Sequence, residues 1–421
     1  MKSLKKSAIF CLCFLVFGIL GQNANAVGVN YGVTNELTLG LTTTFAYQYR
    51  VSPWVEVRSD KLSGWRFVIQ GSGYIRYNPD ALLFRPIIDL DLFRISTPKV
   101  PFLHGYVTWD IGRFLMADTH AMIINDKIDG ISTHLVIPGM VMDFTAGYLG
   151  FQNNLTSKAM ISTDDMLAAA ARKDRVYGLG ARRAVFQWST LFPEFIGRTA
   201  VYGDMIAQVD MRSAVQQSRF SKVKENAKEE VSSVYIGTGF SGPWSKKNNR
   251  LLYDFGIVGE ILARSTSSKG ETFMAAYLNG GFTYLLSKNK QLAFRLQYGT
   301  PNNDDGWSEY RPITYVNAGT FYKGGFANLL KPQIDFRWKI NPSVSMNAGL
   351  ASYIQPKLTR KIVFKREEFE KYYRYTELNL GGQALIMQDI NMKGEFVVGV
   401  TSEHENRIAD VSLRVTLNVG L

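Results

Sequence analysis

Few residues in this sequence have the chemistry and spacing of an active site. The histidines are His104, His120, His134 and His404, and Ser132 stands two residues before His134. On an extended strand Ser132 and His134 would share a face, as a nucleophile and its base require. The order of the two residues is reversed from that of a barrel phospholipase, and no motif places an Asn to orient the histidine. No histidines have metal-ligand spacing, and there is no phosphate-binding glycine loop. The sequence therefore predicts a protein that is not an enzyme and that uses no metal or cofactor.

The chemistry that the sequence does offer is electrostatic. Arginines and aspartates recur in segments where polar and apolar residues alternate, and alternation sends side chains to opposite faces of a strand. If the polar faces line a water-filled lumen, opposed charges would set ion preference and orient dipolar solutes. The predicted pore constriction consists of Asp89, Asp91, Asp110, Arg66, Arg76, Arg113 and Arg183. The competing interpretation is that each of these charges is paired and supports the wall.

The strands that must position these charges are clearest at the end of the chain. In residues 410–421 one set of alternate positions is entirely Val or Leu, and the other set is polar or Gly. Twelve residues of unbroken alternation exceed the usual length of a strand in a soluble protein. They match the 9–11 residues that a tilted strand needs to cross a bilayer.

The same alternation recurs upstream, as at Leu251–Arg264 and Gln291–Tyr298, with aromatic residues near the ends of several apolar faces. Such aromatic ends suit the two interfaces of a membrane. The sequence predicts an all-β, transmembrane, antiparallel up-and-down β-barrel of about 16 strands, with 14 to 18 compatible. The segment Ile313–Asn328 can be read either as a strand or as part of a loop.

The N-terminus has the three regions of a secretory signal peptide. Lys2, Lys5 and Lys6 precede an apolar run from Ala8 to Leu20, and Ala24-Asn-Ala26 forms a small-residue exit. Cleavage after Ala26 would remove three lysines from a net charge of +12, together with both cysteines. A lipid anchor on Cys11 or Cys13 is the rival interpretation, but the residues before them fit a lipobox poorly. We expect residues 1–26 to be removed and residues 27–421 to form one barrel.

Composition excludes some classes of protein but does not separate the remaining two. Hydrophobic residues make up 46% of the chain and aromatic residues 13%, which is too apolar for a disordered chain. A mean hydropathy of −0.08 fits a soluble protein, and it also fits a barrel whose two faces average out. A soluble periplasmic β-protein would need fewer and shorter strands and fewer apolar aromatic ends, so the alternation favours the barrel.

The connections between strands are predicted to be short on one side and long on the other. Longer polar connections lie near residues 152–175, 212–230, 300–312 and 355–371. Short turns face the periplasm and long loops face outward in such barrels. The first loop contains a candidate capped helix at 162–172, and residues 218–231 form a second candidate helical turn with mixed charge. The most basic stretch, 357–374, reads as a solvated loop facing an anionic outer leaflet or as a funnel that recruits ligands.

One segment carries a more specific resemblance. It contains Trp109-Asp-Ile-Gly-Arg-Phe114, then Asp129-Gly-Ile131, then Phe144-Thr-Ala-Gly-Tyr-Leu-Gly-Phe151. It resembles Gram-negative outer-membrane porins, in which a strand ending in Gly-Arg leads into a loop that folds into the barrel and narrows it. The chain departs from that family at its last residue, Leu421, and in the short intervening loop 115–128.

The resemblance implies a porin in the outer membrane that lets small hydrophilic solutes diffuse through a water-filled barrel. The alternatives are a structural or adhesive surface protein that acts through its long loops, and a transporter of hydrophobic ligands. Only about ten residues precede the first strand, which argues against the plug that such a transporter needs. Expected partners are outer-membrane lipids and the barrel assembly machinery, with no nucleic acid. A homotrimer is compatible with the sequence, because its contacts would lie within the lipid-facing apolar stripes.

Overall fold

The computed structural model describes residues 28–420 apart from short internal segments. Those segments are 42–44, 60–63, 79–82, 154, 160, 163–164, 166–178, 213–229, 246–248, 266–269, 302–307, 316–317, 323–324, 358–359, 364–365, 370–372 and 402–408. The expected signal peptide and most of both candidate helical turns therefore lie outside the described residues. In the described part, no helix has the length and hydropathy of a membrane span.

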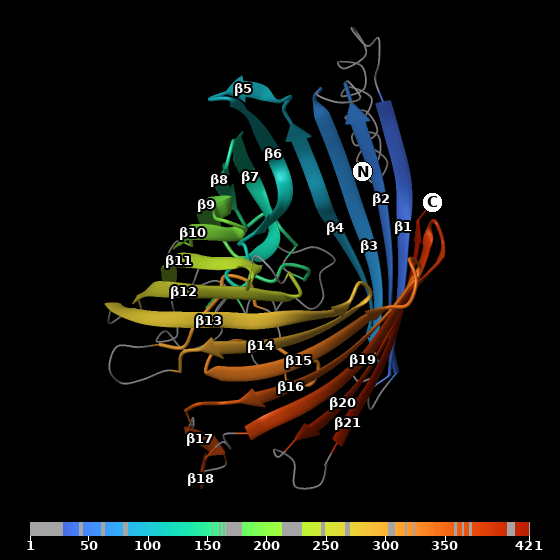
Figure 1. The fold of residues 1–421 in the computed structure, drawn as a ribbon, viewed down its shortest axis with the longest axis vertical. Coiled ribbons are helices and arrows are strands. Elements are labelled where there is room, and N and C mark those ends of the chain that lie inside the picture. The colour runs from blue at the N-terminus through green and yellow to red at the C-terminus, as the bar shows by residue number, and fades with distance from the viewer. Residues whose placement is uncertain are drawn as a thin grey trace, which may run out of the picture.

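The described residues form a barrel of antiparallel strands (Figure 1). In chain order the strands are β1 (Gly28–Leu41), β2 (Phe45–Arg58), β3 (Arg66–Asn78), β4 (Leu83–Ser96), β5 (Val100–Phe102), β6 (Gly105–Ala117), β7 (Asn125–Ile137), β8 (Met140–Tyr148), β9 (Arg183–Ile196), β10 (Thr199–Asp210), β11 (Glu230–Pro243), β12 (Leu251–Ser265), β13 (Gly270–Ser287), β14 (Lys290–Gly299), β15 (Leu329–Lys339), β16 (Val344–Ile354), β17 (Arg360–Val363), β18 (Arg366–Phe369), β19 (Tyr373–Met387), β20 (Ile390–Thr401) and β21 (Ala409–Gly420). Each wall strand pairs with the next, and the circle closes where β1 pairs with β21 from Thr34↔Gly420 to Leu41↔Leu413.

The wall formed by the described residues has eighteen strand positions around the barrel. β4 and β5 pair in succession with the same strand, β6, and so share one position. β17 and β18 form a separate hairpin within the predicted basic stretch. The wall is thus an all-β antiparallel barrel, as predicted, at the upper end of the expected range of strand numbers. The segment 313–328 contains no strand in its described part and forms one isolated bridge, Thr314↔Ala159.

The two faces of the wall have opposite character. On β9, Phe186 and Trp188 are about half exposed (51% and 46%), whereas Gln187 between them is 8% exposed. β12 repeats this pattern, with Ile261 exposed and Glu260 buried. A soluble β-protein buries its apolar face, but here the apolar face points outward and the polar face inward. This arrangement suits a wall surrounded by lipid.

The shortest turns and the longest connections lie at opposite rims. Two-residue turns at 138–139, 197–198, 288–289 and 388–389 join strands at the rim where β1 begins and β21 ends. The connections after β8, β10, β14 and β16 lie at the other rim and are longer. This asymmetry agrees with the predicted orientation, in which the short turns face the periplasm.

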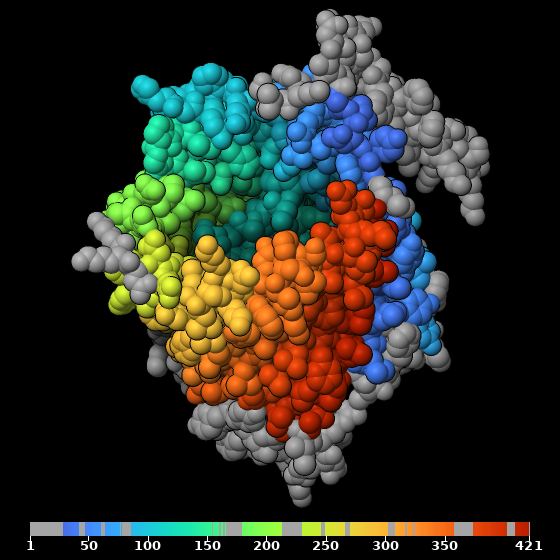
Figure 2. All heavy atoms as spheres, turned by 45° about the vertical axis from the view of Figure 1, so that its right-hand side comes forward, coloured from blue at the N-terminus to red at the C-terminus, as the bar shows by residue number. Residues whose placement is uncertain are grey.

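The interior is hollow at one end and filled in the middle. The space-filling view looks into a hollow bounded by strands from both halves of the chain, with atoms of the β6–β8 region on its floor (Figure 2). The buried apolar cluster includes Ile123, Ile128, Ile161 and Tyr310, which belong to segments inside the wall and pack against inward residues such as Tyr235. The inward folding of these segments creates the constriction described next.

Candidate functional site

The constriction begins where β6 leaves the wall. β4 pairs with β6 only from Phe93↔Arg113 to Ser96↔Asp110, so the rest of β4 has no ladder to β6. Gly112 has a φ of +115°, a conformation that side-chain-bearing residues rarely adopt. A Cβ at Gly112 would lie 2.1 Å from the carbonyl oxygen of Phe93. The glycine therefore permits both the bend and the close contact, and the hairpin beyond it enters the lumen.

A substitution at this bend tests its importance. Gly112→Ala is expected to destabilise the barrel by about 1–3 kcal/mol, because it adds backbone strain at a positive φ and a steric clash with β4. Gly394→Ala is the matched control, since a Cβ at Gly394 meets nothing within 4 Å. Urea unfolding in detergent micelles, followed by tryptophan fluorescence, measures both. Equal unfolding midpoints for the two variants would contradict a strained bend.

The tip of the β6–β7 hairpin is organised by Asp118. Its carboxylate accepts hydrogen bonds of 2.8–3.3 Å from the backbone N–H groups of His120, Met122, Ile123 and Ile124. Burial raises the pKa of Asp118 above its ordinary value, while these N–H donors act in the opposite direction. One side chain thus holds a seven-residue turn, 118–124, in a single shape inside the barrel.

The hairpin tip crosses the lumen and is held on the far side. The Thr119 hydroxyl donates to Asp204 of β10 at 2.7 Å. The Tyr310 hydroxyl donates to the carbonyl of Met122 at 3.1 Å, and the backbone N–H of Thr314 donates to the carbonyl of Ile123 at 3.2 Å. The hairpin tip (114–128) and the described parts of 149–165 and 308–328 therefore form one interlocked body inside the wall, called the constriction from here on.

Three of the predicted constriction residues meet at the seam between β4 and β6. Arg113 donates to both carboxylate oxygens of Asp129 at 2.7 and 2.8 Å and to the carbonyl of Leu90 at 2.9 Å. Asp89 lies 3.8 Å from Arg113 and 2.6 Å from the amine of Lys127. Through these contacts, Arg113 replaces part of the missing ladder and ties the hairpin to the wall.

The seam network extends toward β2 and toward the β8–β9 connection. Asp91 contacts both Lys127, at 2.8 Å, and Arg50, at 2.6 Å. The hydroxyl of Thr156 donates to Asp89, so the segment after β8 is also held at the seam. Lys127, Arg50 and Asp129 were not predicted from the sequence as constriction residues. Lys127 falls in a stretch interpreted as loop, although it lies two residues from Asp129 on the same face.

The other predicted residues lie elsewhere. Asp110 contacts His134 and Arg94 on the short-turn side of the hairpin. Arg66 pairs with Glu56. Arg183 is fully buried in a third cluster, and the side chain of Arg76 lies outside the described residues. Asp89, Asp91 and Arg113 are thus the only ones of the seven that the described residues bring together, and six of the seven have opposite charges within 4 Å.

Arg183 links the wall to the start of the predicted capped helix. It contacts Asp165 at 2.6 Å and Asp210 at 3.6 Å, and it donates to the side chain of Gln208 at 2.9 Å. Ser162 and Asp165 exchange reciprocal hydrogen bonds of 3.1 and 3.2 Å between side chain and backbone. This is the pairing of a capping box, and the helix that would follow lies outside the described residues.

The opposite inner wall carries cations without counter-charges. Arg295, Arg337 and Lys393 line a cavity between β13 and β20, and none has an ion pair among the described residues. The nearby Asp335 accepts from Gln333, and Glu395 accepts from Asn379. Asp335 and Glu395 partly offset the three cations but contact none of them.

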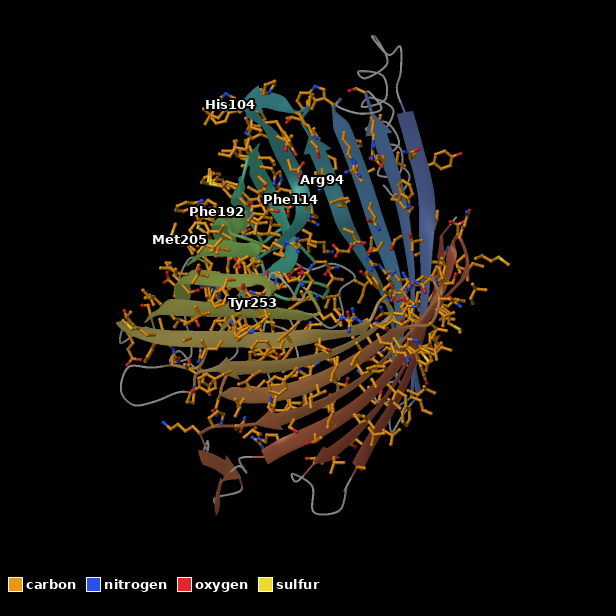
Figure 3. All side chains as sticks on the ribbon, in the orientation of Figure 1. Arg94, His104, Phe114, Phe192, Met205 and Tyr253 are labelled. Atoms are coloured by element: carbon orange, nitrogen blue, oxygen red, sulfur yellow. The ribbon has the colours of Figure 1, made fainter. Side chains whose placement is uncertain are left out.

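Apolar side chains occur on both sides of the wall, and they point in different directions. Phe114 points into the barrel, whereas Phe192 and Met205 project from the outer wall (Figure 3). Among the described residues, no group of three or more His, Cys, Asp or Glu side chains could hold a metal ion. The described residues therefore form a barrel whose interior is narrowed by the constriction and lined by charged side chains.

Comparisons with known proteins identify the fold. The sequence matches no protein-family model and no curated protein. Among solved structures it is similar to OpdK of Pseudomonas aeruginosa (TM-score 0.59, 6% identity, 95% of this chain and 100% of that chain). It is also similar to OccK5 (OpdH) of that organism (0.58, 11%, 94% and 98%) and to its outer membrane protein OprD (0.54, 8%, 93% and 93%). The chain thus shares the β-barrel fold of these outer membrane proteins.

Proposed function

We propose that this protein is an outer-membrane porin that lets small hydrophilic solutes diffuse passively through its lumen. The main support for this proposal is the closed barrel. Its wall is apolar outside and polar inside, and segments folded inward narrow its lumen. A charged, water-lined constriction sorts solutes by size and charge without chemistry. The fold that it shares with outer-membrane proteins supports this location, and lipids and the barrel assembly machinery are then the expected partners.

Cleavage after residue 26, a single domain over 27–421 and a homotrimer belong to the same proposal. Mass spectrometry of the protein purified from outer membranes tests the cleavage site. Cross-linking in native membranes tests the trimer. A mature N-terminus elsewhere would overturn the first, and cross-linked species no larger than one chain would overturn the second.

Conductance in planar bilayers tests the channel itself. The purified protein is expected to insert in discrete ohmic steps in KCl. Silence across many insertions of folded protein would overturn the proposal and leave a surface protein acting through its long loops. Folding is checked separately by the resistance of the barrel to unfolding in unheated detergent gels.

The unpaired cations of the inner wall predict a preference for anions. In a KCl gradient the reversal potential is expected to show chloride permeating more readily than potassium, because fixed positive charge attracts counter-ions into a narrow lumen. The triple change Arg295→Gln, Arg337→Gln and Lys393→Gln should bring the permeability ratio to about one or below. Lys290→Gln is the control, since Lys290 lies against Trp338 on the outer face. An unchanged ratio in the triple variant would contradict this assignment.

A further inference from the structure

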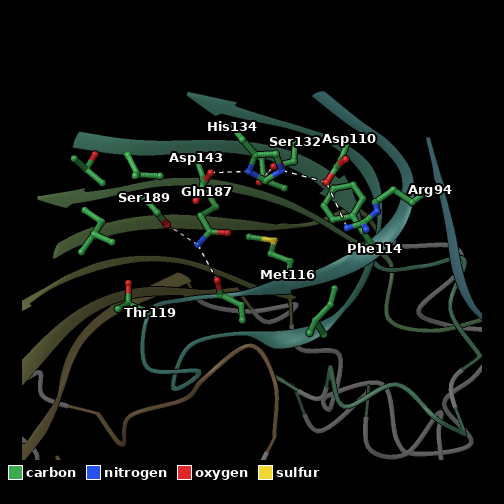
Figure 4. Close-up of a pocket in the computed structure, with 16 residues that line it drawn as sticks. Arg94, Asp110, Phe114, Met116, Thr119, Ser132, His134, Asp143, Gln187 and Ser189 are labelled. Carbon is green, nitrogen blue, oxygen red and sulfur yellow. Dashed lines mark hydrogen bonds and ion pairs between the residues drawn. The ribbon is translucent and has the colours of Figure 1, made fainter. Parts of the chain in front are cut away.

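A cavity of about 350 Å³ lies on the short-turn side of the β6–β7 hairpin. Its wall comes from β4, β6, β7, β8 and β9, and the hairpin residues Leu115, Met116, Ala117 and Thr119 close its other side (Figure 4). The seam network and the Arg183 cluster lie outside it, and so do the unpaired cations of the opposite wall. The cavity is of a size that holds a small solute.

The charges in this cavity neutralise one another in a row. Arg94 lies 3.5 Å from Asp110, and Asp110 lies 3.2 Å from Nε2 of His134. Nδ1 of His134 lies 2.6 Å from Asp143 (Figure 4). A ring whose two nitrogens both face carboxylates donates from both and carries a positive charge. The row therefore alternates in sign and has no net charge.

Because this row of charges is neutral overall, the cavity is unsuited to binding an ion. An entering ion would have to displace an existing contact or lose its hydration without a free counter-charge in return. The outer part of the row nevertheless keeps hydrogen-bonding capacity. The side chain of Asp143 is 39% exposed, and its contact with His134 uses one of its two oxygens. The second oxygen can accept from a solute hydroxyl.

Groups that both donate and accept complete the polar surface. Ser132 and Thr145 share a hydrogen bond of 2.8 Å, and the side-chain amide of Gln187 donates to Ser189 at 2.7 Å. The hydroxyl of Ser189 donates in turn to Asp204 at 2.5 Å. Hydroxyl and amide groups of this kind suit ligands whose own hydroxyls donate and accept.

Apart from Thr119 and Thr190, the remaining surface of the cavity is apolar. Phe114 and Met116 from the hairpin stand with Val141 and Leu191 around the polar row. A sugar ring has C–H groups on its faces and hydroxyls around its edge, so it can satisfy both kinds of surface at once. An ion cannot use the apolar part, and a purely apolar solute would leave the polar row without water.

We propose that this cavity is a binding subsite for a neutral, polyhydroxylated solute of the size of a mono- or disaccharide. Asp143, Gln187 and Arg94 hold its hydroxyls, and the apolar residues contact its ring. The inference rests on the proposed channel function and names a solute class for it. A saccharide bound in this cavity narrows the lumen on the short-turn side of the hairpin and so slows the passage of salt ions.

The test combines a flux measurement with a direct binding measurement. Maltose, added on the short-turn side of single channels in KCl, is expected to reduce conductance in a saturable manner. The zwitterion betaine at equal osmolality should reduce it only through viscosity. Isothermal titration of maltose into the detergent-purified protein measures binding without any need for conduction.

Asp143→Asn and Leu191→Trp probe the two surfaces of the cavity. The first removes a charged acceptor and is expected to weaken maltose affinity about tenfold, and the second fills the cavity and should abolish binding. Asp335→Asn, on the opposite wall, is the matched control and should leave affinity unchanged.

Each outcome has a distinct meaning. Ohmic channels that show no saturable block, together with no heat of maltose binding, would overturn the subsite and leave the channel intact. Maltose binding that Asp143→Asn weakens, in a protein that never conducts, would support the subsite and overturn the channel. Saturable block by betaine but not by maltose would also overturn the assignment to a neutral polyol.

Discussion

Replacing Arg183 by methionine is expected to destabilise the barrel by about 3–5 kcal/mol, the cost of removing one partner from a buried ion pair. Arg183 is fully buried, and its guanidinium meets two carboxylates that are themselves buried, those of Asp165 and Asp210. It also donates to the carbonyl of Val231 at 2.6 Å. Methionine fills similar space but leaves both carboxylates and the carbonyl with fewer donors. Arg212, which also contacts Asp210, can compensate only in part.

The measurement is the urea midpoint in detergent micelles, followed by tryptophan fluorescence. Arg198→Met provides the control, because Arg198 is exposed at the β9–β10 turn and has no ion pair among the described residues. Adding Asp165→Asn to Arg183→Met should recover part of the loss, since one buried charge then disappears. If Arg183→Met and Arg198→Met unfold at the same urea concentration, the buried cluster contributes nothing to stability.

Replacing Arg113 by methionine is expected to open the constriction and to raise single-channel conductance by about twofold or more, because conductance grows with the open cross-section of a pore. Arg113 ties the hairpin to the wall through Leu90 and Asp129 at the seam where β4 and β6 do not pair. Without it, Asp89 and Asp129 lose a cation at short range. The hairpin should then move away from the seam or fluctuate between positions.

A change in charge alone would also alter conductance, so the control must remove the same charge elsewhere. Arg337→Met does this from the opposite inner wall, where Arg337 lines a cavity whose described lining residues all belong to wall strands. Arg113→Met should increase the size of the largest neutral polymer that enters the pore, and Arg337→Met should not. An Arg113→Met channel with unchanged polymer exclusion would show that the hairpin does not set the width of the pore.

Much of the wall could be predicted from sequence because a strand between lipid and water is patterned by its two solvents. In β21, Val411, Leu413, Val415, Leu417 and Val419 alternate with polar residues or Gly, so every second residue indicates which face it occupies. The strand number was harder to predict, because the breaks in pattern around β4, β5 and β6 coincide with the seam and its bend. The segment 313–328 has apolar residues such as Ile313 and Tyr322, which pack inside the constriction rather than against lipid.

The partners within the lumen could not be predicted in the same way. Asp89, Asp91 and Arg113 share inward faces of neighbouring strands, so their proximity followed from alternation. Arg183 lies on such a face too, yet its closest partner, Asp165, comes from a connection whose path no periodicity encodes. Asp110 contacts His134 on β7, and His134 contacts Asp143 on β8. From the sequence, His134 was considered only as a possible catalytic partner of Ser132, and Asp143 was not predicted at all.

The segments inside the barrel are fastened to the wall by inward side chains, while the register of the wall is set by strand pairing. Glu377 of β19 accepts from the backbone N–H groups of residues 320–322, and Tyr235 of β11 packs in the same buried cluster as Ile123 and Tyr310. Two kinds of contact are therefore divided between two parts of the same strands: backbone groups close the wall, and inward side chains hold its contents.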